Sequence, residues 1–243
     1  MYFISNSMAK SASTLLCDLT KKSVIASFGS EGQKALIQAI TAGELLGWGG
    51  FIANCSNVDV LAKLRVLSNK YGPFVVKTHA PLTDDLRHAI ENGDARVSYI
   101  YRDPRDAMLS AMSNYESTKS SNRVEFKEFD TLDAALIRYV DIAKHAVTWK
   151  ESGLAAILRY EEFVNDIEGE LKNCLQELGL VIPHDLVTEF VASAKASQEE
   201  KEGWNLRFNI GISGRFRQEL TPTDLKKSTM ALDISIRALG YAS

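Results

Sequence analysis

Short apolar runs alternate along the chain with longer segments in which apolar residues recur every three or four positions. The short runs are rich in β-branched and aromatic residues and contain few polar side chains, which is typical of strands buried on both faces of a parallel sheet. They predict five strands, at Tyr2–Ser5, Val24–Ser27, Phe74–Lys77, Val97–Tyr101 and Ala155–Leu158.

The longer segments predict helices between these strands and through the C-terminal third of the chain. The expected helices are Thr14–Lys22, Gln33–Leu46, Val58–Tyr71, Asp84–Asn92, Pro104–Asn114, Leu132–Lys150, Ile167–Leu178, Asp185–Ala194 and Thr223–Leu239. Such alternation favours an α/β fold. We expect one three-layer, P-loop-like domain over residues 1–243, with a central, mainly parallel sheet flanked by helices and a helical C-terminal part.

Composition narrows the class of protein. The chain has 243 residues, 45% of them hydrophobic and 24% charged, which is typical of a globular protein and excludes a disordered chain. The net charge of −3 argues against a broad nucleic-acid-binding surface, so an anionic ligand needs a local basic site. The sequence shows no membrane-spanning run and no signal peptide, and its three cysteines lack disulfide or zinc spacing. We expect a cytoplasmic protein with no nucleic-acid or membrane partner.

A loop of small residues with one lysine, Lys10, follows the first strand and precedes a helix. Helix N-termini bind anions through unpaired N–H groups and a partial positive charge. Hydroxyl donors in the loop are Ser11, Ser13 and Thr14. An ATP-binding P-loop would place glycine at positions 7 and 12 and lysine at 13, and the chain has none of these. The pattern predicts a phosphate cradle without the ATPase lysine; a hydroxyl-capped helix without a ligand is the alternative.

Two later strand ends also carry basic side chains. Lys77 and His79 share one face of an extended segment and emerge at the carboxyl edge of the sheet, where α/β proteins bind ligands. A histidine there can act as a general base near neutral pH. Arg102 leaves the next strand and can bind phosphate through two N–H groups, with Ser110 on the following helix. Alternatively, Arg102 pairs with Asp106 and only caps the turn.

These segments, in this order, resemble the motifs of the 3′-phosphoadenosine-5′-phosphosulfate (PAPS)-dependent sulfotransferase family. The segment from Lys10 to Leu15 resembles P-K-S-G-T-T-W, the loop that binds the 5′-phosphosulfate. Residues 77–81 resemble K-T-H-x-P, whose histidine is the catalytic base. Residues 102–110 resemble R-x-P-x-D-x-x-x-S, whose arginine and serine hold the 3′-phosphate. Residues 160–163 resemble a segment with a tyrosine near the adenine, and residues 209–217 resemble the R-K-G-x-x-G-x-W-K loop that closes over the 3′-phosphate.

The resemblance implies that the chain moves a sulfuryl group from PAPS to a hydroxyl or amine of a small, polar acceptor, leaving 3′-phosphoadenosine 5′-phosphate (PAP), with no metal. The implied catalytic residues are His79, Lys10 and Lys77. The implied nucleotide-binding residues are Lys10, Ser11, Ala12, Ser13, Thr14, Leu15, Arg102, Ser110, Tyr160, Arg207, Asn209, Ile210 and Gly211.

Four departures from the family pattern put details in doubt. Ala12 stands in place of the loop glycine, and Leu15 in place of the tryptophan that stacks on adenine. Asn209 and Ile210 replace an Arg-Lys pair, whose charge Arg207 or Arg215 would then supply. Residue 222 is proline where the family's dimerisation pattern has valine, so that dimer is not expected and the oligomeric state stays open.

The sequence predicts the acceptor site less clearly than the nucleotide site. The segment Gly47–Phe51 could line it, or its aromatic residues could belong to the core. The polar segment Tyr115–Asp130 is a candidate lid and favours a polar acceptor such as a sugar, a natural-product alcohol or a guanidinium metabolite. A P-loop kinase and a nucleotide-binding protein without catalysis remain the alternative functions.

Overall fold

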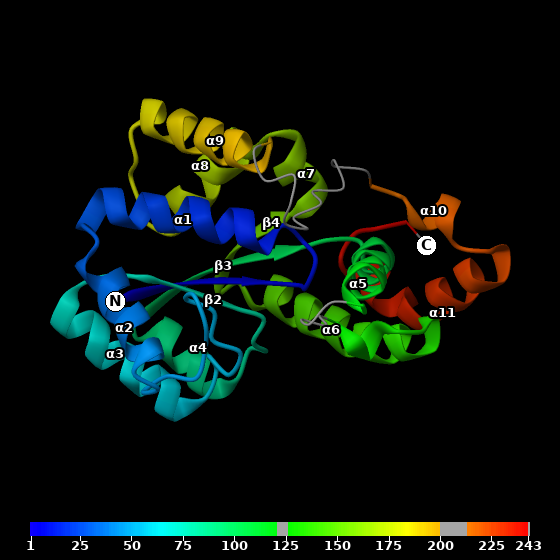
Figure 1. The fold of residues 1–243 in the computed structure, drawn as a ribbon, viewed down its shortest axis with the longest axis horizontal. Helices are drawn as coiled ribbons and strands as arrows, with labels where there is room; N and C mark the ends of the chain where they lie inside the picture. The colour runs from blue at the N-terminus through cyan, green and yellow to red at the C-terminus, as the bar shows by residue number, and fades with distance from the viewer. Residues whose placement is uncertain (121–125, 200–212, 243) are drawn as a thin grey trace.

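The computed structural model describes residues 1–120, 126–199 and 213–242, with the side chains of 195–199 left out. Its centre is a sheet of four parallel strands in the order β2-β1-β3-β4 (Figure 1). The strands are β1 (Tyr2–Ser7), β2 (Val75–Thr78), β3 (Ala95–Tyr101) and β4 (Ala155–Arg159). This arrangement confirms the expected α/β fold with a parallel sheet.

Alternate residues of β1 point into two separate hydrophobic layers. Tyr2 and Ile4 belong to one core and Phe3 to the other, as the two-residue period of a strand requires. Helices α1 (Ser13–Phe28), α8 (Ile167–Glu177) and α9 (His184–Glu199) contribute to the Phe3 side. Helices α2 (Glu31–Thr41), α3 (Val58–Tyr71), α4 (Asp84–Glu91), α5 (Pro104–Thr118), α6 (Leu132–Ser152) and α11 (Pro222–Ala238) contribute to the other. The central strands are therefore covered on both faces.

The C-terminal part is helical, as predicted. Helix α11 packs along α6 and α5, on the side of the molecule away from α2 and α3 (Figure 1). Short elements complete the chain: the 3-10 turn Lys127–Phe129, α7 (Tyr160–Asn165) and α10 (Phe216–Glu219).

The predicted strand at Val24–Ser27 is wrong, because these residues form the last turn of α1. Leu16, Leu19 and Val24 are buried together on the helix face that covers the sheet, so their burial follows a helical period. A short run of β-branched and apolar residues does not by itself distinguish a strand from the end of a buried helix. Packing against the sheet decides in favour of the helix.

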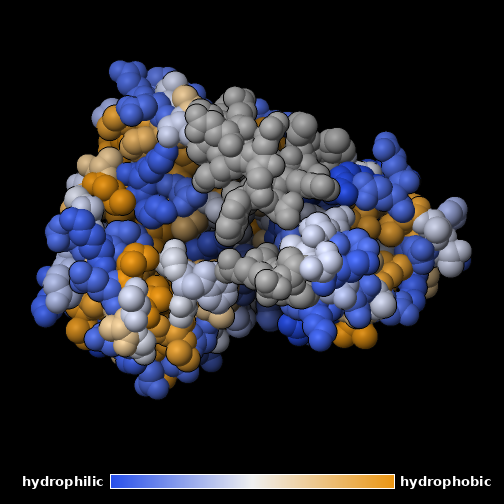
Figure 2. Space-filling model, in the orientation of Figure 1, coloured by the Kyte–Doolittle hydropathy of each residue, from blue (hydrophilic) through white to orange (hydrophobic). Residues whose placement is uncertain are grey.

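The surface mixes polar and apolar side chains. On the face drawn in Figure 2, blue and orange residues are interspersed over the described elements. Within the described part of the chain, each helix is too short or too polar to cross a bilayer.

Candidate active site

The carboxyl ends of β1, β2 and β3 meet at one edge of the sheet. In the ladder, Asn6 of β1 lies opposite Thr78 of β2 on one side and Tyr99 of β3 on the other. The loop before α1, the turn containing His79 and the turn containing Arg102 therefore leave the sheet next to one another. The structure brings together the three segments that the sequence analysis singled out.

The loop between β1 and α1 has the features of an anion site. Lys10 and Ala12 both adopt left-handed backbone conformations, with φ of 67° and 61°. Ala12 is the N-cap of α1 and makes no side-chain cap, so the first N–H groups of the helix have no partner from that residue. The Ser11 hydroxyl is buried with no hydrogen-bond partner among the described residues. Buried hydroxyls are normally paired, so an anion bound here would satisfy both groups.

Replacing Ala12 with glycine should stabilise the protein. A left-handed conformation costs an L-residue about 1 kcal/mol or more, and glycine adopts it freely. We expect a gain of about 0.5–1 kcal/mol, seen as a rise in Tm of about 2 °C in a thermal melt. The matched control is Ala9→Gly in the same loop, where the backbone is not left-handed; this change should lower Tm. A fall in Tm for Ala12→Gly would show that the methyl contacts outweigh the backbone strain.

Helix α6 contacts the same loop through Tyr139. The Tyr139 hydroxyl lies 3.3 Å from the Ala9 carbonyl oxygen and 2.8 Å from that of Ala107, so it bridges the loop and α5. The Lys10 ammonium lies 5.2 Å from the ring centroid of Phe126, within cation–π range. Tyr139 lies within the predicted helix Leu132–Lys150, and its role could not be predicted because a helical period does not show where a hydroxyl donates.

The His79 ring is hydrogen-bonded to Ser7, the last residue of β1. Its Nδ1 atom lies 2.9 Å from the Ser7 carbonyl oxygen and 2.9 Å from the Ser7 Oγ. The surrounding protein desolvates the ring and lowers its pKa to about 4, and the charge of Lys77 acts in the same direction, while the Ser7 carbonyl opposes the shift. The ring is neutral at pH 7. His79 nevertheless keeps an exposed surface, so solvent and ligands can reach it.

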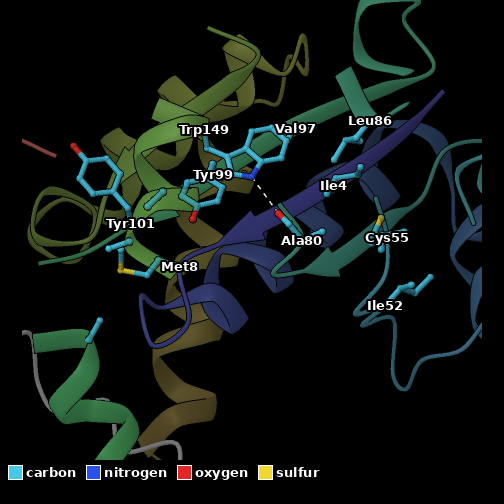
Figure 3. Close-up of a cluster of buried hydrophobic side chains, with 14 of the residues drawn as sticks. Ile4, Met8, Ile52, Cys55, Ala80, Leu86, Val97, Tyr99, Tyr101 and Trp149 are labelled. Carbon is cyan, nitrogen blue, oxygen red and sulfur yellow. Dashed lines mark hydrogen bonds between the residues drawn. The ribbon is translucent and has the colours of Figure 1, made fainter. Parts of the chain in front are cut away.

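The turn after β2 is fixed by hydrogen bonds to the Ala80 carbonyl oxygen. It accepts from the Asn6 side chain at 2.9 Å and from the Trp149 indole at 3.1 Å, the contact dashed in Figure 3. Trp149 itself stacks on Tyr99 in the core (Figure 3). Elements on both sides of the turn thus hold the backbone next to His79.

Lys77 joins β2 to the first turn of α1. Its ammonium donates to the Thr14 hydroxyl at 2.6 Å. Burial lowers the pKa of Lys77, with Cys17 and Asp18 opposing the shift. Two residues predicted separately, one as catalytic and one as nucleotide-binding, are therefore in direct contact.

Arg102 is almost fully enclosed, with 3% of its surface exposed. Its guanidinium lies 4.2 Å from the ring centroid of Tyr160, and one nitrogen lies 3.8 Å from the Asp106 carboxylate. The ion pair of the alternative reading is therefore present, but the cap of α5 is the Asp103 side chain, which accepts from the N–H of Arg105. Arg102 and Tyr160, both assigned to the nucleotide, meet in space.

Asp106 binds the described end of the late loop, the name used here for residues 207–217. Its carboxylate accepts the N–H of Gly214 at 2.6 Å and the N–H of Phe216 at 3.2 Å. The sequence analysis gave Asp106 only a pairing role with Arg102. The predicted ligands Arg207, Asn209, Ile210 and Gly211 lie outside the described residues.

Three other predicted nucleotide ligands, Ser13, Ser110 and Leu15, differ from one another in exposure. Ser13 is half-buried at the first position of α1, and Ser110 is half-buried on α5. Leu15, at 7% exposure, packs in the core between α1 and the sheet. The expected nucleotide contacts of these three residues stay predictions.

An aromatic turn lies beside His79. Trp48 and Phe51 exchange backbone hydrogen bonds at 3.0 and 2.8 Å around Gly49 and Gly50, both of which have positive φ, as in the tight turns that close hairpins. The Phe51 ring lies 4.5 Å from Trp48 and 5.4 Å from the His79 ring, between centroids. Trp48 is 61% exposed, so it is not a core residue.

The family model and the solved structures that resemble this chain both point to sulfotransferases. The sulfotransferase domain family matches residues 7–233. Mouse sulfotransferase SULT7A1, solved in complex with PAP, has a TM-score of 0.61 and 18% identity, covering 99% of this chain and 88% of its own. Retinol dehydratase, solved with retinol and PAP, has a TM-score of 0.59 and 16% identity, covering 97% of this chain and 81% of its own. A search of curated proteins finds no match. Since the family match extends from the end of β1 into α11, the chain belongs to the sulfotransferase family.

Proposed function

We propose that the protein transfers a sulfuryl group from PAPS to a hydroxyl or amine of a small, polar acceptor, with His79 as general base. The observation that carries this proposal is the pair of contacts that joins the β2 turn to the phosphate loop: His79 to Ser7, and Lys77 to Thr14. They support a neutral imidazole close to the N-terminus of α1, where the phosphosulfate would bind. PAP in solved structures of the same fold supports the choice of nucleotide.

The nucleotide would extend from the phosphate loop toward Arg102. The N-terminus of α1, the Ser11 hydroxyl and Lys10 would hold the 5′-phosphosulfate. Arg102 and Ser110 would hold the 3′-phosphate, and Tyr160 would lie near the adenine. Of the remaining expected ligands, Ala12, Ser13, Thr14 and Leu15 belong to α1 and its cap, and Arg207, Asn209, Ile210 and Gly211 to the late loop.

Sulfuryl transfer depends on positioning and electrostatic stabilisation, as phosphoryl transfer does. When bound, PAPS supplies the activated sulfuryl group, and PAP leaves with the electron pair of the broken bond between sulfur and oxygen. His79 takes the proton from the attacking hydroxyl or amine. Lys10 and Lys77 stabilise the negative charge that develops toward the departing phosphate.

The acceptor would approach from the side of Trp48 and Phe51. The Phe51 ring lies 5.4 Å from the imidazole and the Trp48 ring lies 4.5 Å from Phe51, between centroids, and the carbon skeleton of a polar acceptor such as a sugar can pack on such rings. The oxygen or nitrogen that reacts would then point toward His79.

Thermal melting distinguishes the proposed function from its rivals. We expect PAP to raise Tm more than ATP with Mg²⁺ does at the same concentration, because the ligand that binds the folded protein more tightly stabilises it more. A larger shift with ATP would favour a P-loop kinase and contradict the proposal. Incubation with PAPS and an acceptor panel, followed by mass spectrometry for the gain of one sulfate, separates an enzyme from a protein that only binds nucleotide.

A further inference from the structure

Ser7 presents two oxygen atoms to one nitrogen of the His79 ring. Both the Ser7 carbonyl oxygen and the Ser7 Oγ lie 2.9 Å from Nδ1. A carbonyl oxygen only accepts hydrogen bonds, so a contact of this length requires a proton on Nδ1. In the neutral ring, the Nε2 atom then carries the lone pair.

The position of Ser7 is itself well defined. Its N–H donates to the Asn6 side chain at 2.8 Å, and the same side chain donates to the Ala80 carbonyl oxygen at 2.9 Å. Ser7 is the last residue of β1 and is buried, with 3% of its surface exposed. The backbone that carries the two acceptor oxygens is therefore tied to the backbone that carries the ring.

The groups around the imidazole do not compete for Nδ1. From the aromatic turn the ring faces Phe51, which has no hydrogen-bonding side-chain atoms, and from its own segment the charge of Lys77 acts on it. Lys77 is a cation and cannot accept the Nδ1 proton.

We propose that Ser7 is a positioning residue for His79: its carbonyl oxygen selects the Nδ1–H tautomer, its hydroxyl oxygen is a second acceptor for the same N–H, and Nε2 is thereby presented as the proton acceptor. This inference rests on the proposed function, since it assumes that His79 is the base. When Nε2 takes the acceptor's proton, Nδ1–H becomes part of an imidazolium, and its hydrogen bonds to Ser7 strengthen. Ser7 thus has the orienting role that a carboxylate has in a Ser-His-Asp triad, without adding a negative charge beside an anionic nucleotide.

The test is the change Ser7→Ala, which removes the hydroxyl and leaves the carbonyl. Nitrogen-15 NMR of the histidine rings at pH 7, with His79→Gln to assign the signals, reads the tautomer directly in the nucleotide-free protein. Loss of one hydrogen bond should reduce the excess of the Nδ1–H form, and kcat, by about 2- to 10-fold, while the affinity for PAP is unchanged. Ser7→Cys keeps the shape with a weaker acceptor and should give a smaller change in the same direction.

Ser98→Ala is the matched control. Ser98 is a fully buried serine of β3, and its removal should leave the His79 signals unchanged. An Nε2–H tautomer of His79 in the unmodified protein would overturn the role of the Ser7 carbonyl, and unchanged His79 signals in both Ser7 variants would overturn that of the hydroxyl. A loss of PAP affinity at constant kcat would overturn the positioning role as a whole. Because the NMR measurement needs no substrate, it also reports on Ser7 if His79 proves not to be the base.

Discussion

Replacing His79 with alanine should lower the rate of sulfuryl transfer by about 100- to 10,000-fold, the usual contribution of a general base. The loss should appear in kcat, because the alanine variant keeps the phosphate loop, Lys77 and Arg102. Binding of PAP, measured by calorimetry, should change little. The depressed pKa of His79 means that the wild-type ring is already unprotonated at pH 7, so the defect should persist at higher pH.

His145→Ala serves as the control for this change, because His145 is an exposed residue of α6. It should retain wild-type activity. An active His79→Ala variant would exclude His79 as the base. An inactive variant that also fails to bind PAP would assign His79 to nucleotide binding instead.

Replacing Arg102 with methionine should remove the preference for a nucleotide with a 3′-phosphate. We expect the ratio of the Kd values for adenosine 5′-phosphate and PAP to fall by about 10- to 100-fold, because a hydrogen bond to a charged group contributes about 1.5–3 kcal/mol. Calorimetric titration of both nucleotides gives the ratio. Any general loss of stability from losing the ion pair with Asp106 affects both titrations alike and cancels in the comparison.

Arg105 offers a matched control three residues away. It too is buried, but its guanidinium pairs with Asp103 and donates to the Ala242 carbonyl oxygen. Arg105→Met should lower Tm without changing the nucleotide ratio. If the ratio is unchanged in Arg102→Met, Arg102 does not recognise the 3′-phosphate, and its contacts with Asp106 and Tyr160 are structural.

The main features of the fold could be predicted from the sequence. Strands buried on both faces produce continuous apolar runs, and four of the five predicted runs are strands of the sheet. The exception is Val24–Ser27, at the end of α1. There the local composition resembles that of a strand, and only packing against the sheet distinguishes a helix end from a strand. Likewise α7 was not predicted, because six residues carry too little periodicity.

The site was predictable where chemistry resides in side chains at strand ends. Lys10, Lys77, His79 and Arg102 could be grouped because parallel strands end at one edge. The two Ser7 oxygen atoms that face Nδ1 of His79 could not be predicted. One is a backbone carbonyl, and the other is the hydroxyl of one serine among several near the end of β1. The bridging role of Tyr139 was hidden for a similar reason, since its ring satisfies the apolar pattern while its hydroxyl makes the contact.

The Gly49–Gly50 turn has a practical consequence for protein engineering. A Cβ added at Gly49 would meet no atom within 4 Å, and at Gly50 only the ends of Gln33 and Ile37, so space does not restrict either position. The restriction is the positive φ at both, which favours glycine over residues with a side chain. A mutagenesis library aimed at new acceptors should therefore randomise positions 48 and 51 and keep both glycines, so that every member presents its two new side chains beside the same imidazole.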